Sequence, residues 1–595
     1  MATSLARRPI LSWLYNHNPF YVISSALMLY AVRTAYGELE VGEINCRIML
    51  GVLAAYTSIL AGVSVLIVRW GTVWEDARSL LLLLLLLFLA VSVSADDLFV
   101  NMESSTGGTL LMLGGYLFAA TVTELVLRGT GLRLGWKYRL PLHLLLLLFY
   151  VTPWWCSPEL HQRSARELEW TIFAFPVIAS ALLLGLLPAI RSGPDYANDN
   201  GSPWRWPWYP WPAFVIIGIA VAFRSFALSM TFGPTGPIWI ELASGGRQIA
   251  FDTAWGTYFL IPLVLAMLIL ILEAGFVTGN QKTIQQALKA APVLLILALP
   301  FSDGEVFRGF LRQFAETLGS PLWLTVWTLS GFYLLAWLRG AADAEKGFLF
   351  LFSLLSIVGP QSVDLRTLTP LEPWPLLMVG GILLGQGVWT RSSQRCLGGS
   401  VMLVLALWLW LPVTLLAVWR MTICFHLLWG TVILLGLTFR DRTAETLRIA
   451  GAVLMPLTSM IVMTHPAVAV VPIEWRITYL ILLTVICVGI AMTSRNMWYW
   501  YAFLTVIACS VYELAAVVFR DLASLIGQAA LTAIAWSTAS LLIAFLISAH
   551  KARWLPRRIF PLWKNHPPSE SDMLPTATEA PVSPDQSTPP ETTSR

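Results

Sequence analysis

Long apolar runs recur along almost the whole chain and constrain its fold more than any other feature. Each run holds roughly 20 mostly apolar residues, and polar or Gly/Pro-rich breaks separate it from the next. A helix of that length crosses about 30 Å of hydrocarbon and satisfies its own backbone hydrogen bonds. The chain is 57% hydrophobic and only 12% charged, whereas soluble domains carry roughly 25% charged residues. We therefore predict an all-α, polytopic integral membrane bundle of about 16 to 18 transmembrane helices.

The individual spans follow from the positions of the apolar runs. The weakest are 286–302 and 347–359. The first is short and its apolar run stops at Pro300, and the second is shorter still, so either could be re-entrant. The predicted spans are 18–35, 48–68, 79–95, 109–127, 139–155, 170–190, 211–230, 255–276, 286–302, 321–338, 347–359, 374–390, 397–418, 421–438, 447–463, 477–492, 497–518 and 523–549.

Charge asymmetry between the loops orients the spans, because Lys and Arg accumulate on the cytoplasmic side. With the N-terminus inside, the alternation of spans places most of the 38 Lys and Arg residues in cytoplasmic loops. The basic stretch "MATSLARR" before the first span is typical of a signal anchor. We predict a bacterial cytoplasmic (inner) membrane protein with both termini in the cytoplasm.

The composition changes sharply after residue 550. Residues 551–564 are basic and aromatic, and the remainder of the tail is rich in Pro, Ser and Thr. The first part suits an anionic lipid surface, and the second is typical of disordered chains. The predicted organisation is a multi-spanning membrane domain at 1–550 and a disordered cytoplasmic tail at 551–595.

Three ionisable residues within spans are predicted to share one layer of the membrane. Arg224 lies roughly 20 Å from the inner end of its span, and Glu513 lies roughly 24 Å from the inner end of its own. His426 lies about one and a half turns from the outer end of its span, at a similar depth. Together they could bind an anionic or phosphate-bearing group or relay protons. The structural alternative is that Arg224 snorkels outward and Glu513 reaches the nearby surface.

A second charged layer is predicted near the cytoplasmic boundary. Glu124 and His143 lie close to the ends of two helices that a short basic loop joins, and Glu273 lies at comparable depth. A Glu124–His143 pair is therefore geometrically easy. The structural alternative is a boundary salt bridge from Glu124 to Arg128 or Arg139.

Acidic residues in the first two outer loops support a different hypothesis. Glu38 and Glu40 follow the first span, and Asp96 and Asp97 follow the third. This layout resembles the lipid-linked-sugar glycosyltransferases of the multi-spanning superfamily. The resemblance implies an outer-loop carboxylate, Glu38 or Glu40 and Asp96 or Asp97, as base or metal ligand. It also implies a basic group, Arg224 or an outer-loop Arg, on the lipid phosphate.

The first span carries a second resemblance. In "HNPFYVISSALMLYAVR" the residues that carry it are Asn18, Pro19, Phe20, Tyr21 and Ser24. The stretch looks like the first span of large, uncharacterised multi-pass proteins of bacterial genomes. That group implies no activity.

Three further segments have both structural and functional interpretations. "SDGEVFRGFLRQFAETLG" has the spacing of an amphipathic helix on the outer surface, as a strap or as a lid over a cavity. "SPWRWPWYPWP", residues 202–212, is typical of an interfacial anchor, with a ligand-stacking platform as the alternative. Cys46 and Cys156 lie on predicted outer loops and are either bonded to each other or unpaired thiols.

These patterns favour transport or flipping of a polar or lipid-linked anionic molecule through an outward-facing cavity, rather than catalysis. A membrane glycosyltransferase with a lipid-linked donor is the first alternative, and a non-catalytic sensory or structural component is the second. The expected partners are the lipid bilayer and such a molecule, and not nucleic acid, because the basic residues are spread over many loops. No motif has metal-ligand or cofactor spacing, so we expect neither.

Overall fold

The structure is a computed structural model of the chain. It describes residues 19–37, 43–96, 99, 105–157, 164–232, 238–241, 247–250, 256–300, 305–363, 368, 372–411, 417–464, 472–494 and 496–551. The chain divides into two compact units, Met1–Leu454 and Met455–Arg595, and the boundary falls within a helix.

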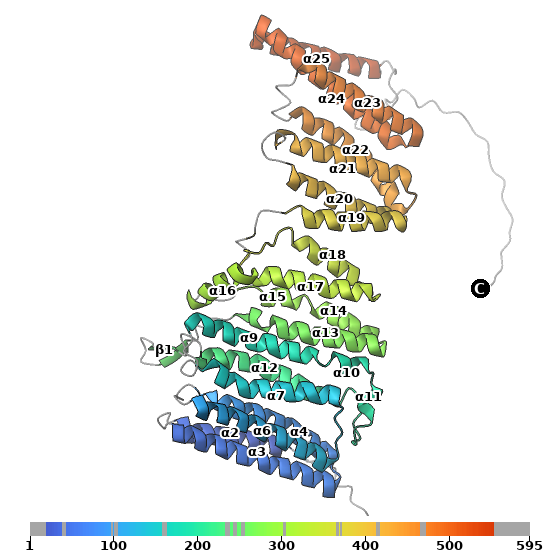
Figure 1. The fold of residues 1–595 in the computed structure, drawn as a ribbon. Coiled ribbons are helices and arrows are strands. Elements are labelled where there is room, and N and C mark those ends of the chain that lie inside the picture. Colours follow the sequence, from blue (N-terminus) through green and yellow to red (C-terminus); the bar gives the residue numbers. More distant parts are fainter. Residues whose placement is uncertain are drawn as a thin grey trace, which may run out of the picture. The chain divides into compact units, whose positions relative to one another are not determined.

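The described part of the first unit is almost entirely helical (Figure 1). Its elements are α2 (Phe20–Gly37), α3 (Glu43–Gly71), α4 (Trp74–Ser94), α6 (Ser105–Thr130), α7 (Trp136–Cys156), α9 (Ala165–Leu184), α10 (Leu187–Arg191), α11 (Asp195–Asn198), α12 (Trp211–Phe232), β1 (Ile238–Glu241), β2 (Arg247–Ala250), η1 (Thr257–Leu260), α13 (Ile261–Thr278), α14 (Gln281–Ala290), α15 (Val293–Leu297), α16 (Glu305–Leu318), α17 (Pro321–Leu338), α18 (Ala344–Leu354), α19 (Trp374–Trp389), α20 (Ser393–Trp410) and α21 (Ala417–Thr438).

The second unit is also helical. Helix α22 (Arg442–Thr464) carries the boundary between the units, and α23 (Ile473–Ser494), α24 (Met497–Ile526) and α25 (Gln528–Lys551) follow it. The predicted all-α class is confirmed for the described residues, with one minor departure. Strands β1 and β2 form a short antiparallel hairpin in which Ile238 lies opposite Ala250.

Local sequence signals set several helix boundaries. Ser164 and Glu167 form a capping box at the start of α9, where each side chain bonds the backbone N–H of the other residue. Ser320 caps α17, and Pro321 follows it in the first turn, where its missing N–H has no helical partner to lose. Gly279 ends α13 with φ 65°, a conformation that glycine adopts without strain.

Eleven helices of the described residues are long and apolar enough to cross a membrane. They are Arg47–Gly71, Trp74–Ser94, Thr106–Thr130, Arg166–Arg191, Trp211–Ser229, Thr257–Thr278, Pro321–Leu338, Trp419–Thr438, Glu474–Thr493, Met497–Leu522 and Gln528–Phe545. Phe20–Val32 and Trp374–Trp389 are shorter apolar helices. Each of the thirteen overlaps a span that the sequence predicts.

The two weakest predicted spans do not form single long helices. Residues 286–302 contain the end of α14 and the 5-residue α15, and Pro292 lies between the two helices. Proline lacks the N–H that would continue the helix and therefore divides this run. Residues 347–359 contain the end of α18, whose 11 residues rise about 17 Å, short of the roughly 30 Å of a bilayer core.

Helix α12 joins parts of the chain that are distant in sequence. It packs against α4, α7 and α9 as well as α13, and these helices lie side by side in Figure 1. Val221 and Leu228 are fully buried on the same helix as Arg224. The side chains of α12 therefore face helices from both earlier and later parts of the chain, including α4, which begins at Trp74. This packing creates the first candidate site.

The predicted amphipathic helix forms as α16 and packs on the protein. Phe307, Phe310, Leu311 and Phe314 are buried, whereas Leu318 is 48% exposed. The ring of Phe314 stacks on Trp170 of α9 at 5.7 Å between centroids. The strap interpretation fits this packing, because the apolar face of α16 covers the aromatic side chains of α9.

The Trp/Pro-rich segment folds back on the start of α4. Trp204 meets Trp74 edge to face, with ring centroids 5.3 Å apart. The guanidinium of Arg78 lies 5.0 Å from the ring of Trp208, which is 63% exposed. An exposed tryptophan beside arginine suits the level of lipid headgroups, which supports the interfacial anchor.

Some sequence predictions concern positions outside the described residues. These are Glu38, Glu40, Asp97, the side chain of Cys46 and the tail beyond residue 551. The structure describes Asp96 and Cys156. Because the side chain of Cys46 lies outside the described residues, the Cys46–Cys156 bond stays a prediction.

The carboxylate of Asp441 ties α20 to the start of α22. It accepts hydrogen bonds from the backbone N–H and the hydroxyl of Ser393, at 3.1 and 2.7 Å, and from the N–H of Ala444 at 3.0 Å. The bond from the Ser393 hydroxyl is the main reason that the pKa of Asp441 lies below its usual value. Since the charged form is the one that the fold favours, its contribution to stability is present at neutral pH.

We expect Asp441→Ala to lower the free energy of unfolding by about 1 kcal/mol at neutral pH, as loss of a helix cap does. The folded-state pKa is depressed, so this difference shrinks as the pH falls below about 4 and through the folded pKa. Thermal unfolding of the detergent-solubilised protein at pH 7 and pH 3 measures it. Asp441→Asn keeps a capping oxygen and serves as the control. An Asp441→Ala difference that is equal at both pH values contradicts the assignment.

Candidate functional site

Arg224 forms a buried ion pair with Asp96. The two side chains are 1% and 2% exposed. One terminal nitrogen of Arg224 donates to Asp96 Oδ1 at 2.6 Å, and the other donates to Oδ2. The arrangement is bidentate, the geometry in which guanidinium and carboxylate bind most strongly. An arginine in the middle of an apolar helix thus has a specific partner 128 residues away.

Three features of the fold position this pair. Helix α12 packs against α4, and Asp96 lies just beyond the last residue of α4. The carbonyl of Ser92, in the last turn of α4, accepts a weak hydrogen bond from Arg224 at 3.4 Å. A cation at this place is favoured by the partial negative charge of a helix C-terminus. The Ser92 hydroxyl donates to the carbonyl of Phe149 at 2.6 Å and thereby holds α4 against α7.

One donor of Arg224 stays open within the described part of the chain. Its Nε is buried and has no hydrogen-bond partner among the described atoms. Leaving a buried donor unsatisfied costs roughly 1–3 kcal/mol. A ligand oxygen that reached this atom would recover that cost, so the pair combines a neutralised charge with one available N–H.

The predicted environment of Arg224 is corrected in one respect. The snorkelling alternative is wrong, because the guanidinium is buried against Asp96 and does not extend to an interface. Depth alone could not reveal this, since snorkelling and pairing are both possible at the same position along a helix.

Glu513 and His426 are not placed beside Arg224. Glu513 belongs to the second unit and is partly buried on α24, and the two units are described separately. His426 lies on α21, whose main neighbour is α20, whereas α12 packs on α4, α7, α9 and α13. The ring of His426 bonds the carbonyl of Thr422 one turn earlier, with a distance of 2.6 Å from Nδ1 to oxygen. A role of either residue in substrate binding stays a prediction.

The predicted Glu124–His143 pair is confirmed. His143 Nε2 lies 2.9 Å from Glu124 Oε1. Arg139 binds the same carboxylate, with Nε 2.6 Å from Oε1 and a second bond to Oε2. The boundary salt bridge therefore forms as well, with Arg139 as its partner. The two predictions are compatible because one carboxylate accepts from both neighbours.

Glu273 belongs to a separate cluster. Its carboxylate accepts from Arg191 of α10 at 2.7 Å and from Arg339, the residue after α17. Glu273 is 7% exposed, and Arg339 also lies over the ring of Phe276. Sequence reasoning singled out the acid but neither arginine. Arg191 is the last residue of α10, and Arg339 directly follows α17. An arginine at the end of an apolar run is the sequence signal that could have identified both.

Of the outer-loop acids that the glycosyltransferase resemblance implies, the structure describes Asp96 alone. The same resemblance names Arg224 as the basic group, and the structure brings these two residues into contact. Within the described ranges no group of three or more His, Cys, Asp or Glu side chains is arranged to hold a metal ion.

Comparisons with known proteins add little to this geometry. No protein-family model and no curated protein matches the chain. Among solved structures, one match is a circular tandem repeat protein with a novel repeat topology and enhanced subunit contact surfaces. The identity is 13%, over 84% of this chain and 91% of that chain. The TM-score is 0.20, so this likeness carries no argument about fold or function.

Proposed function

We propose that the chain is an inner-membrane protein with 16 to 18 crossings and both termini in the cytoplasm. The eleven long apolar helices support this, together with the two shorter ones and with α7, α20 and α22, which occupy predicted spans. These account for about 16 crossings. The segments at 286–302 and 347–359 bring the count to about 18 if both cross as interrupted helices, and leave it at about 16 if both are re-entrant.

We further propose that the protein transports or flips a polar or lipid-linked anionic molecule. The observation that carries this proposal is the buried Arg224–Asp96 pair with its open Nε donor. Apolar side chains of similar volume are often at least as stabilising as a buried ion pair. Charged residues deep inside such a bundle therefore indicate a functional role. An anionic group that approaches Arg224 competes with Asp96 and gains the free N–H. Glu513 and His426 are proposed as further substrate contacts.

The alternative proposal is a membrane glycosyltransferase that uses a lipid-linked donor. The contact between Asp96 and Arg224 favours it, because the resemblance implies an acid and a phosphate-binding arginine in one site. In the described structure the Asp96 carboxylate is 2% exposed and is bound by the guanidinium of Arg224. Catalysis would require the ion pair to separate before Asp96 could act on a substrate. In transport, the substrate itself separates the pair when it binds Arg224.

The test reconstitutes the full chain in liposomes that contain fluorescent phosphatidylglycerol or a fluorescent isoprenyl phosphate. We expect the protein to accelerate movement of at least one probe between leaflets, measured as loss of fluorescence to an external reductant. The double variant Arg224→Met/Asp96→Leu should reduce this rate about tenfold or more, since loss of about 1.4 kcal/mol of transition-state stabilisation suffices.

The matched control is Asp343→Asn/Lys346→Gln, which removes an ion pair whose side chains are 64% and 83% exposed. It should leave the rate unchanged. Transport by the Arg224/Asp96 double variant at the native rate contradicts the proposal, and so does native protein that moves neither probe faster than empty liposomes.

A further inference from the structure

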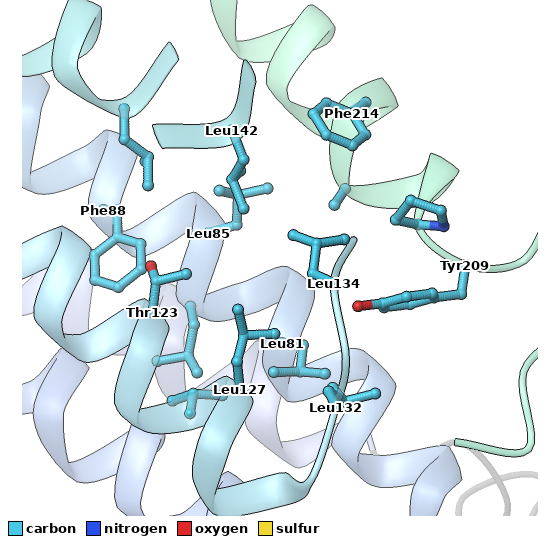
Figure 2. A pocket seen from close by; sticks show the side chains of 15 residues that line it. Leu81, Leu85, Phe88, Thr123, Leu127, Leu132, Leu134, Leu142, Tyr209 and Phe214 are labelled. Atoms are coloured by element: carbon cyan, nitrogen blue, oxygen red, sulfur yellow. The ribbon is translucent and has the colours of Figure 1, made fainter. Parts of the chain in front are cut away.

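An apolar cavity lies among α4, α6, α7 and the start of α12, at the ends of these helices that our topology places toward the cytoplasm (Figure 2). The lining includes leucines of α4 and α6, Phe88 of α4, Leu142 of α7 and Phe214 of α12. Leu132 and Leu134 of the loop between α6 and α7, with Tyr209 of the Trp/Pro-rich segment, complete the lining. The cavity is separate from the Arg224–Asp96 pair and belongs wholly to the first unit.

The lining selects hydrocarbon over water. Its volume is about 110 Å³, somewhat below the roughly 150 Å³ of an engineered apolar cavity that stays dry and binds benzene. Its side-chain hydroxyls already have partners: Thr123 donates to the carbonyl of Ala119, and Tyr209 lies 3.5 Å from the carbonyl oxygen of Arg133. The mostly apolar lining therefore offers water few hydrogen-bond partners. The size suits a few methylene groups of one chain and not a whole lipid.

Two basic side chains adjoin the lining of the cavity. Arg78 precedes Leu81 by three residues and Leu85 by seven, so it lies on the same face of α4, one turn closer to the helix end. Arg133 lies between the two lining leucines of the loop, and its side chain is 73% exposed. The segment 128–139 that contains it carries four basic residues and no acid.

Three acidic residues lie near these two arginines in the described structure. Asp199 pairs with Arg133 at 3.4 Å, but Asp199 is 91% exposed, and such exposed pairs contribute little. Glu75 and Asp76 lie in the first turn of α4, before Arg78. Arg139 is bound to Glu124 and is not available to a ligand. Arg78, one turn from Leu81, and Arg133, between Leu132 and Leu134, adjoin the lining and are the cations that we assign to an incoming anion.

We propose that this cavity holds part of an acyl chain of an anionic glycerophospholipid of the cytoplasmic leaflet, with the lipid phosphate held by Arg78 and Arg133. Basic pockets between transmembrane helices on the cytoplasmic side recognise anionic headgroups in this way. Trp208 lies beside Arg78, and tryptophan is a residue type that favours the level of the headgroups. The proposal requires the chain to lie in a bilayer, but it does not depend on transport or on the Arg224–Asp96 pair.

The test uses the full chain in phosphatidylcholine nanodiscs. They contain a small fraction of phosphatidylglycerol with a photoreactive group on its acyl chain. Mass spectrometry locates the adducts. We expect labelling at Leu81–Phe88 and Leu132–Leu146, several-fold above that from a phosphatidylcholine probe with the same chain. Arg78→Gln and Arg133→Gln should each lower the phosphatidylglycerol labelling about fivefold, because one basic contact contributes about 1 kcal/mol. Both variants should leave the phosphatidylcholine labelling unchanged.

Two variants fill the cavity. Ala213→Phe and Thr123→Leu each add volume to the lining and should abolish labelling at these peptides, while lipid-facing helices such as α25 stay labelled. Thr123→Leu serves where Ala213→Phe lowers the unfolding temperature. Equal labelling by the two probes in the native protein overturns the headgroup assignment. Labelling that persists in a folded cavity-filling variant overturns the acyl-chain site.

Discussion

Asp96→Ala is expected to destabilise the protein by about 3–5 kcal/mol, because it leaves the guanidinium of Arg224 buried and without its carboxylate. The remaining contact, to the carbonyl of Ser92 at 3.4 Å, is too weak to compensate. Arg224→Met should have a cost in the same range, since Asp96 would then be a buried charge with its guanidinium partner removed. Reversible unfolding in mixed detergent and SDS micelles measures both.

The double variant Arg224→Met/Asp96→Leu separates the net contribution of the pair from the cost of breaking it. Apolar replacement of both partners is often neutral or stabilising by about 1–4 kcal/mol, so it should be far more stable than either single variant. Asp199→Ala, which removes an exposed pair with Arg133, is the control and should change stability by less than about 0.5 kcal/mol. A double variant as unstable as Asp96→Ala would show that the site needs charge for folding itself.

Gly399→Leu is expected to disrupt the close pairing of α19 and α20. A Cβ at Gly399 would lie 2.7 Å from the carbonyl oxygen of Gly380 and 2.7 Å from the backbone nitrogen of Leu384. Both contacts are with backbone, which cannot rotate away, so the helices must separate. Overpacking of this kind costs about 1–3 kcal/mol, and the leucine variant should reach or exceed the upper end. Small residues allow this approach between helices in a membrane.

The neighbouring glycine supplies the control. A Cβ at Gly381 meets nothing within 4 Å, so Gly381→Ala should stabilise the helix by about 0.5–1 kcal/mol. Opposite signs for Gly399→Ala and Gly381→Ala are therefore expected in the same unfolding assay. If both substitutions stabilise the protein, the close packing of α19 and α20 is wrong.

Which contacts could be predicted from sequence depended on how the partners are connected. Glu124 and His143 lie at the ends of helices joined by a short loop, so their distance is limited by the chain itself, and the pair was predictable. The partner of Arg224 was not, because the depth of a residue along a helix is only one of three coordinates. Depth along the helix made Glu513 and His426 equally good candidates for the partner of Arg224. The packing of α12 on α4 instead brings Asp96 into contact with it.

The same distinction applies to the helices. The apolar runs by themselves determined that this chain is helical and where most helices lie, because a helix closes its backbone hydrogen bonds within one segment. Pro292 divides the run at 286–302 for an equally local reason, although the predicted span continued through it. The tertiary structure alone decided which charges meet, which glycines touch a neighbour and where an apolar cavity opens. Those features arise between segments, and van der Waals packing between apolar helices leaves no periodic signal that names the partner.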